Sequence, residues 1–147
     1  MELKDEIVIA APRTQVYDAL NDPEVLRKCI PGCEELEKHS DTELSAKVTL
    51  KIGPVKAKFN GEVTLNPENP PEHFSLKGEG KGGAAGFAKG GADVVLEEHE
   101  EGTLLRYDAR ADIGGKLAQL GSRLVQGTAK KLSAKFFDNF KNEVEGS

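Results

Sequence analysis

The segment "LSAKVTLKIGPVKAKFNGEVTL", residues 44–65, decides the fold, because apolar and polar residues alternate through nearly all of it. A period of two is typical of a β-strand with one buried face. Gly53-Pro54 interrupts the alternation as a turn would, so the segment predicts two antiparallel strands joined by a tight connection. The residues predicted to face inward are Leu44, Ala46, Val48, Leu50, Ile52, Val55, Ala57, Phe59, Gly61, Val63 and Leu65.

The same period continues on both sides of this hairpin. Further strands are predicted at 3–9, 74–80, 92–98 and 103–113. In the last of these, Tyr107 falls on the inward face with Leu105 and Ala109, and charged residues alternate on the outward face. The chain therefore has an antiparallel meander of about six strands that follows an N-terminal strand.

Helical signals lie at the two ends of the meander. Pro12 and the pair Asp22-Pro23 are typical of helix starts, so two short helices are expected after the first strand. From Lys116 onward, apolar residues recur three or four apart and predict one amphipathic helix of about 30 residues. Strands followed by a helix predict an α+β fold, with the helix packed on one face of the sheet.

The glycine-rich stretch "GEGKGGAAGFAKGGA", residues 78–92, contains the pattern G-x-G-x-x-G. A dinucleotide-binding fingerprint requires a helix to begin inside this pattern, and here another strand follows. We interpret the stretch as a hairpin with its tip near residues 82–87. Small residues in its arms indicate either a strong bend or the opening of an interior space, and spacing alone does not separate the two.

Composition limits the classes of function. The chain has 147 residues, enough for one domain, which we place at 1–147, and its net charge of −5 argues against nucleic-acid binding. The N-terminus has no signal-peptide pattern and no stretch is long and apolar enough to span a membrane, so a cytoplasmic protein is expected.

Side chains suited to catalysis or metal binding are few on the predicted inward face. His39, His73 and His99 each lie beside a different turn and are interpreted as surface histidines. Cys29 and Cys33 do not have the C-x-x-C spacing of redox or zinc sites and are expected to be free thiols. Tyr107 is the only inward side chain with a titratable group, so no metal site and no tightly bound cofactor are expected.

The N-terminal segment "IVIAAPRTQVYDALNDPEVLRKCIPGCEEL" resembles the signature of the CoxG family, the G-subunit family of carbon monoxide dehydrogenase. The matching features are the helix-starting Pro12, the pair Val16-Tyr17, Asp22-Pro23 and Pro31-Gly32-Cys33, although tryptophan is expected where this chain has Tyr17. The segment "ADIGGKLAQLGSRLV" resembles the same family's approach to the long helix. The order of elements is similar to the helix-grip fold of the START-like and pollen-allergen (SRPBCC) superfamily.

The resemblance implies a curved antiparallel sheet of about seven strands around a long C-terminal helix, with an apolar cavity between them. It also implies a non-catalytic accessory role beside a molybdenum-containing dehydrogenase or hydroxylase. Such a protein would recruit the enzyme to the membrane or carry a hydrophobic molecule, such as a lipid or quinone. A polyketide cyclase-like enzyme of the same fold and an assembly factor with a filled interior remain the alternatives.

Two sets of residues are candidates for function. The apolar inward face predicts a cavity lined by Leu50, Phe59, Val63, Leu76, Tyr107, Leu120 and Leu124. The glycine-rich hairpin and the start of the helix predict a reversible contact with an anionic membrane surface, because they combine an aromatic residue with cations. The residues of this contact are Phe87, Lys81, Lys89, Lys116 and Arg123. An alternative is that Phe87 folds back over the cavity as a lid.

Overall fold

The computed structural model of the chain describes residues 1–146, and its centre is a single antiparallel sheet. The strands are β1 (Glu2–Ile9), β2 (Cys33–Lys38), β3 (Glu43–Ile52), β4 (Val55–Asn69), β5 (His73–Lys81), β6 (Phe87–His99) and β7 (Gly102–Gly114). They lie in the order β1-β7-β6-β5-β4-β3-β2, so six strands form the predicted meander and β1 returns to pair with β7.

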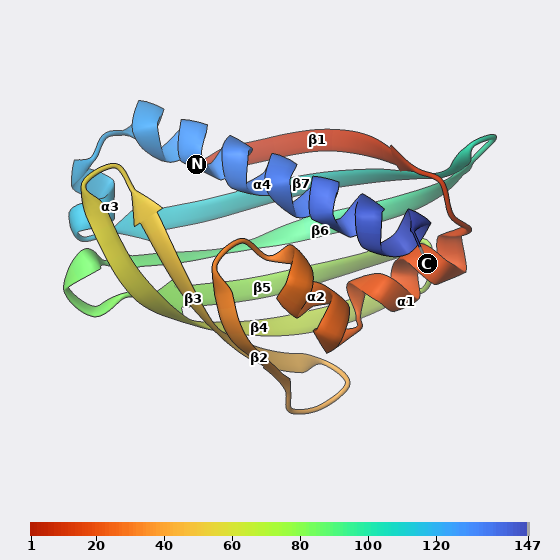
Figure 1. The fold of residues 1–147 in the computed structure, drawn as a ribbon, viewed down its shortest axis with the longest axis horizontal. Coiled ribbons are helices and arrows are strands. Elements are labelled where there is room, and N and C mark those ends of the chain that lie inside the picture. The colour runs from red at the N-terminus through yellow and green to blue at the C-terminus, as the bar shows by residue number, and fades with distance from the viewer. Residues whose placement is uncertain (147) are drawn as a thin grey trace.

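Helices cover one face of this sheet. They are α1 (Arg13–Leu20), α2 (Pro23–Cys29), α3 (Lys116–Gln119) and α4 (Ser122–Glu145), with a short 3₁₀ turn, η1, at Gly83–Ala85. The sheet curves around α4, which runs along its inner face, and α1 and α2 lie near the C-terminal end of α4 (Figure 1). This arrangement confirms the predicted helix-grip fold.

Two polar contacts fix the short helices. Asp22 caps α2, since its Oδ1 accepts a hydrogen bond of 2.9 Å from the backbone N–H of Glu24, as the pair Asp22-Pro23 predicted. The buried Thr103 hydroxyl donates a hydrogen bond of 2.7 Å to the Ala11 carbonyl, which ties the start of α1 to β7. Both contacts satisfy backbone groups that would otherwise lack a partner.

The glycine-rich stretch forms a hairpin, as predicted. It supplies the end of β5 and the start of β6, with η1 at the tip. At Gly90 an added Cβ would lie only 1.9 Å from the carbonyl oxygen of Arg110, so glycine is required by the close approach of β7. No α-helix begins within residues 78–92, all of which the structure describes, and this rules out the dinucleotide-binding arrangement.

The buried side chains form two clusters at different ends of the sheet. The larger one lies among α1, α2, the C-terminal half of α4 and the sheet, and contains fully buried Ile9, Val16, Leu96, Leu105 and Phe140. The smaller one, called here the end cluster, consists of Phe59, Ala85 and Leu117, with Leu50, Ile52, Val55, Ala57, Ile113 and Leu120 packed against it. The interior therefore has two packing centres.

Two features differ from the sequence-based expectation. The strand β2 was not identified individually, because its residues "CEELEK" show no regular alternation. The single helix of about 30 residues is also wrong, because the chain breaks at Gly121, where φ is +93°. A helix cannot continue through a left-handed residue, so α3 and α4 are separate.

The break at Gly121 predicts that alanine substitutions at Gly121 and at Gly127 change the free energy of unfolding in opposite directions. Gly121→Ala should lower the free energy of unfolding by about 1 kcal/mol or more, because alanine is strained at positive φ. Gly127→Ala should raise it by up to about 1 kcal/mol, because Gly127 lies inside α4 with open space around its Cβ position. Urea unfolding of the two variants measures both effects, and stabilisation by both would mean that the helix is continuous through residue 121.

Candidate functional site: an apolar cavity between the sheet and α4

A cavity of about 450 Å³ lies between the inner face of the sheet and the helices. All seven strands contribute to its wall, α1 and α2 close one side, and α4 contributes Ser133, Phe136 and Phe137. The wall is almost wholly apolar, as expected for a site that receives a hydrophobic molecule.

The cavity exists because small residues lie on the strands at its floor. They are Ala46, Gly61, Ala92 and Ala109, which belong to β3, β4, β6 and β7. The rings of Phe136 and Phe137 approach from α4 and keep the helix at a distance from these small side chains. The glycine-rich hairpin contributes Ala92 to this floor, so its arms contain both a close strand contact and part of an interior space.

Among the described lining residues, three have polar side-chain groups: Ser45, Tyr107 and Ser133. Tyr107 is hydrogen-bonded to Ser133 and its ring stacks on Phe137, with centroids 5.2 Å apart and an interplanar angle of 19°. Burial, and to a lesser extent the charge of Asp5, raise the pKa of Tyr107 above its ordinary value, although the bond to Ser133 opposes this shift. The hydroxyl therefore stays protonated near neutral pH and can donate a hydrogen bond to a ligand.

The sequence-predicted lining residues separate into three groups. Val63, Leu76 and Tyr107 line the cavity. Leu50, Phe59 and Leu120 belong instead to the end cluster, and Leu124 is 39% exposed at the start of α4. All of them except Leu124 are at least partly buried, but only the first three bound the empty space.

The end cluster explains this division. An added Cβ on Gly82 would lie 2.5 Å from the Phe59 ring, so that ring packs directly on the hairpin backbone. Leu117 of α3 is buried in the same cluster. This packing fills the interior at the end of the molecule where the alternation of residues alone predicted a hollow.

A groove of about 500 Å³ adjoins the cavity between the edge strand β1 and α4. The two spaces share Leu3, Tyr107, Ser133 and Phe137. The stacked rings of Tyr107 and Phe137 therefore belong to both the cavity wall and the groove. Lys130 and Asp138 of α4 lie along this groove.

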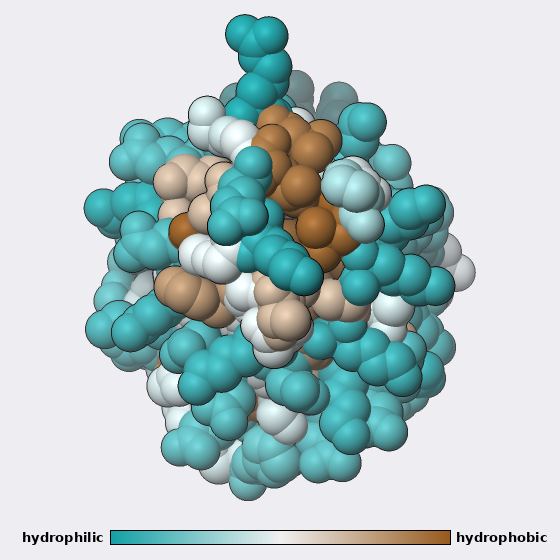
Figure 2. Space-filling model, turned by 90° about the vertical axis from the view of Figure 1, so that its left-hand side faces the viewer, coloured by the Kyte–Doolittle hydropathy of each residue, from teal (hydrophilic) through white to brown (hydrophobic). Residues whose placement is uncertain are grey.

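The predicted membrane-contact residues gather at the end of the molecule that holds α3 and the β3–β4 and β5–β6 turns (Figure 1). Figure 2 views this end and shows a band of hydrophobic surface bordered by hydrophilic side chains. Leu124 lies here against the β3–β4 turn, since an added Cβ on Gly53 would be 2.9 Å from its Cδ2. Lys81, Lys89, Lys116 and Arg123 are all exposed, although Lys81 also lies 3.7 Å from Glu79.

Phe87 lies on the outer face of the sheet. It is 42% exposed and pairs across strands with Gly114, whose added Cβ would lie 2.2 Å from the Phe87 ring. The inward-facing residues of β6, such as Val94 and Ala92, have the opposite parity. The ring is thus directed away from the cavity, and the structure gives no support to a lid formed by Phe87.

Both cysteines are free, as expected. Cys29 is fully buried, and burial raises the pKa of its thiol to about 11. Burial also raises the pKa of the Cys33 thiol, which donates a hydrogen bond to the Glu35 carbonyl. Both thiols therefore stay protonated near neutral pH, which makes them poor nucleophiles and poor metal ligands.

One polar cluster was missed from the sequence. His73 lies between the carboxylates of Glu68 and Asp93 on the outer face of the sheet. These residues are on β4, β5 and β6, so only the strand pairing brings them together. Spacing along the chain gave no signal for it.

Comparison with known proteins places the chain in a family. The model of the CoxG family, described as the G-subunit of carbon monoxide dehydrogenase, matches residues 6–145. A conserved protein from Geobacillus kaustophilus has a similar solved structure, with a TM-score of 0.92, 32% sequence identity, and coverage of 100% of this chain and 97% of that chain. No curated protein matches the chain.

More distant structures share the fold alone. Ara h 8.0201 gives a TM-score of 0.68 at 14% identity, with coverage of 100% of this chain and 99% of that chain. The Zhui aromatase/cyclase from Streptomyces sp. R1128 gives 0.68 at 11% identity, with coverage of 99% and 93%. These neighbours confirm the helix-grip architecture.

Filling the floor of the cavity should exclude a ligand without unfolding the protein. Ala92→Leu is expected to weaken binding of a fluorescent fatty acid at least about tenfold, because its added methyl groups occupy the space that the ligand needs. The free energy of unfolding should change by less than about 1.5 kcal/mol, because the added atoms enter empty space.

Ala84→Leu is the matched control, because Ala84 is exposed at the hairpin tip and outside the cavity. Its affinity for the fatty acid, measured by fluorescence titration, should equal that of the wild type. Equal affinity of Ala92→Leu and wild type would show that the probe binds elsewhere.

Proposed function

The chain belongs to the CoxG family of carbon monoxide dehydrogenase, and from that premise we propose that it is a non-catalytic carrier of a hydrophobic molecule. The carrier works at a membrane surface beside a molybdenum-containing dehydrogenase. Its ligand is a lipid or a quinone-like compound, taken up from the membrane and presented to the enzyme, or used to hold the enzyme there.

The observation that carries this proposal is the cavity. Its volume of about 450 Å³ is within the usual range for small-molecule sites, and its wall is apolar apart from Ser45, Tyr107 and Ser133. A ligand held there would gain free energy mainly by leaving water. The hydroxyls of Tyr107 and Ser133 give such a ligand one polar anchor, which suits a molecule with a carbonyl or hydroxyl group on an apolar body.

The same lining residues favour a ligand-carrier function over a cyclase-like reaction. An acid–base enzyme needs a group that exchanges protons near the working pH. Among the described lining residues the titratable side chain is Tyr107, and its pKa is raised further from neutrality. This leaves the bound molecule without a proton acceptor in the described cavity wall.

The surface around α3 supports contact with a membrane. Exposed Phe87 and Leu124 lie at this end with Lys89, Lys116 and Arg123. Apolar side chains enter the interface of a bilayer, and each nearby cation adds about 1 kcal/mol on an anionic surface. Because only these few side chains take part, the proposed contact is peripheral and reversible. Among residues 1–146 no helix has the length and hydropathy to cross a membrane.

The role beside an enzyme follows from the family. The family description names a subunit of carbon monoxide dehydrogenase, and the resemblance in the N-terminal segment implies an accessory protein. A carrier with a hydrophobic ligand would link such an enzyme to a membrane-soluble electron acceptor. The partner enzyme itself would supply all redox chemistry.

Vesicle co-sedimentation tests the membrane part of the proposal. Binding should increase with the fraction of anionic lipid and fall with salt, because screening weakens the contribution of the cations. Lys89→Ser should weaken binding to anionic vesicles about fivefold, the factor for about 1 kcal/mol. Phe87→Ser should weaken binding at every salt concentration.

Lys28→Ser is the control, because Lys28 is an exposed cation on α2, away from the α3 end. It should bind vesicles as the wild type does. If the wild type stays in solution with anionic vesicles at low salt, direct membrane contact is wrong. The ligand-carrier function is tested separately, by measuring the transfer of a fluorescent naphthoquinone from these vesicles to the protein.

A further inference from the structure

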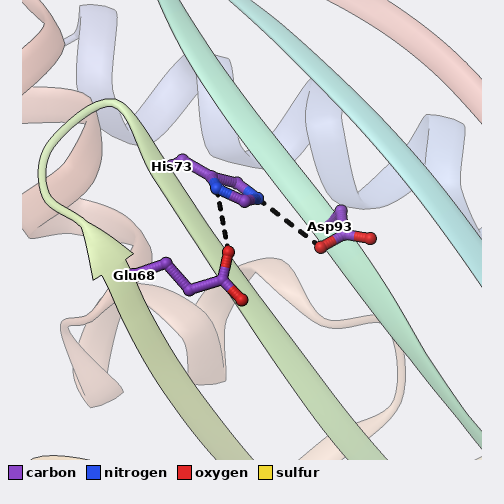
Figure 3. A group of neighbouring side chains, drawn as sticks. All are labelled: Glu68, His73 and Asp93. Carbon is purple, nitrogen blue, oxygen red and sulfur yellow. Dashed lines mark ion pairs between the residues drawn. The ribbon is translucent and has the colours of Figure 1, made fainter.

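The outer face of the sheet, opposite to the cavity, has a histidine held between two carboxylates. His73 begins β5, and its Nδ1 lies 2.9 Å from Oε2 of Glu68 on β4. Its Nε2 lies 3.5 Å from Oδ1 of Asp93 on β6. Figure 3 shows the ring between the two carboxylates. All three side chains are between 35% and 49% exposed, so an ion can reach them.

The two distances between the His73 ring and the carboxylates are unequal, and this bears on which ring nitrogen carries the proton. The contact with Glu68 is the shorter one, and the neutral tautomer with its proton on Nδ1 directs that proton towards Glu68. In the neutral ring, Nε2 then presents a lone pair towards the Asp93 carboxylate, which also offers only lone pairs. These two hydrogen-bond acceptors cannot bond to each other, but a cation between them could bind both.

The distance between Nε2 of His73 and Oδ1 of Asp93 also fits a metal ion bound between them. Two ligand atoms that each lie about 2.1 Å from a tetrahedral zinc ion are about 3.4 Å apart. The Nε2–Oδ1 separation in this protein is 3.5 Å, which exceeds the range of a normal hydrogen bond. A metal-binding histidine commonly donates its other N–H to a carboxylate that fixes its orientation, which is the position of Glu68.

Asp108 adds negative charge beside Asp93 on the same face of the sheet. It lies directly across from Asp93 in the pairing of β6 with β7, and both aspartates line the same outer groove. Its Oδ2 is 3.6 Å from Lys4 Nζ, but its Oδ1 is buried and has no hydrogen-bond partner among the described residues. Like charges directly opposite each other destabilise a sheet, and a cation between them would reverse this effect.

We propose that this face binds a divalent transition-metal ion, with His73 Nε2 and Asp93 as protein ligands, Asp108 as a neighbouring carboxylate that adds negative charge, and Glu68 as the residue that orients the imidazole. An imidazole nitrogen and a carboxylate oxygen are ligands that suit Zn²⁺, and water would fill the remaining positions. The site is independent of the cavity and of the proposed carrier function.

The site also has a structural relation to the cavity wall. Phe74 and Val94 each adjoin one of the two ligands in sequence, and both line the cavity from the opposite face of the sheet. A metal ion that joins β5 and β6 at these positions would fix the relative positions of the two strands. Binding of the ion should therefore stabilise the wall of the cavity.

Calorimetric titration of the metal-free, tag-free chain with ZnCl₂ tests the site. We expect a single ion per chain. His73→Ala should abolish this binding, and Glu68→Gln should weaken it about 10- to 100-fold, the usual effect of losing the group that orients a histidine ligand. Asp93→Asn should also weaken it, through loss of a charged ligand.

Two variants are matched controls. His99→Ala removes another turn histidine, whose Nδ1 accepts a hydrogen bond from the Glu101 N–H, and Cys33→Ser removes the less buried thiol. Both should bind Zn²⁺ as the wild type does. Circular dichroism would confirm that all variants are folded.

Nitrogen-15 NMR of the histidine rings in the wild type gives a test that needs no variant. Addition of Zn²⁺ should shift the His73 Nε2 resonance into the range of a metal-bound nitrogen, while Nδ1 stays protonated. The competing explanation is a permanently protonated ring that bridges Glu68 and Asp93. A doubly protonated ring that is unchanged by millimolar Zn²⁺, or zinc binding that survives His73→Ala, would overturn the proposal.

Discussion

The contact between the ring of Phe137 on α4 and the ring of Tyr107 on β7 sets the spacing between helix and sheet. The rings stack with centroids 5.2 Å apart, and Phe136 and Phe140 extend the aromatic row along α4. Bulky rings on the helix and small residues on the strands, Ala92 and Ala109 among them, line the same cavity. Because the helix rests on its own aromatic side chains, it cannot approach the sheet closely enough to fill the space beside them.

This spacing makes the middle of the interior hollow while both ends are packed. Phe140, Val16 and Ile9 fill the end near α1, and Phe59 and Leu117 fill the end near α3. An empty cavity costs stability roughly in proportion to its volume. A hydrophobic ligand would recover part of that free energy, so the hollow is more easily explained as a binding site than as an imperfect core. The polar groups at one side, Tyr107 and Ser133, would then orient the ligand.

Much of the fold could be predicted, because every strand except β2 carries its own signal. The alternation at 44–65 fixes which side of each strand faces inward, and Asp22-Pro23 marks a helix start through local chemistry alone. The break at Gly121 could not be predicted, since glycine is compatible with either sign of φ.

The candidate site could be predicted less well, and for a physical reason. Alternation shows that Phe59 and Val63 share a face, but the choice between packing and lining depends on what lies opposite each residue. Phe59 meets the backbone of Gly82, whereas Val63 faces the open space beneath α4. The His73 cluster requires the register of β4, β5 and β6, which is a property of pairing and not of any one segment.

The central claim is that the cavity holds a hydrophobic molecule in the cell. The direct measurement is native mass spectrometry of the protein purified from its own host without detergent, followed by organic extraction and identification of the released compound. The account predicts one hydrophobic molecule of a single chemical class on a large fraction of the chains, and its loss when the cavity floor is filled at residue 92. Protein that is uniformly free of ligand, and that takes up no lipid or quinone when these are added, would contradict the account.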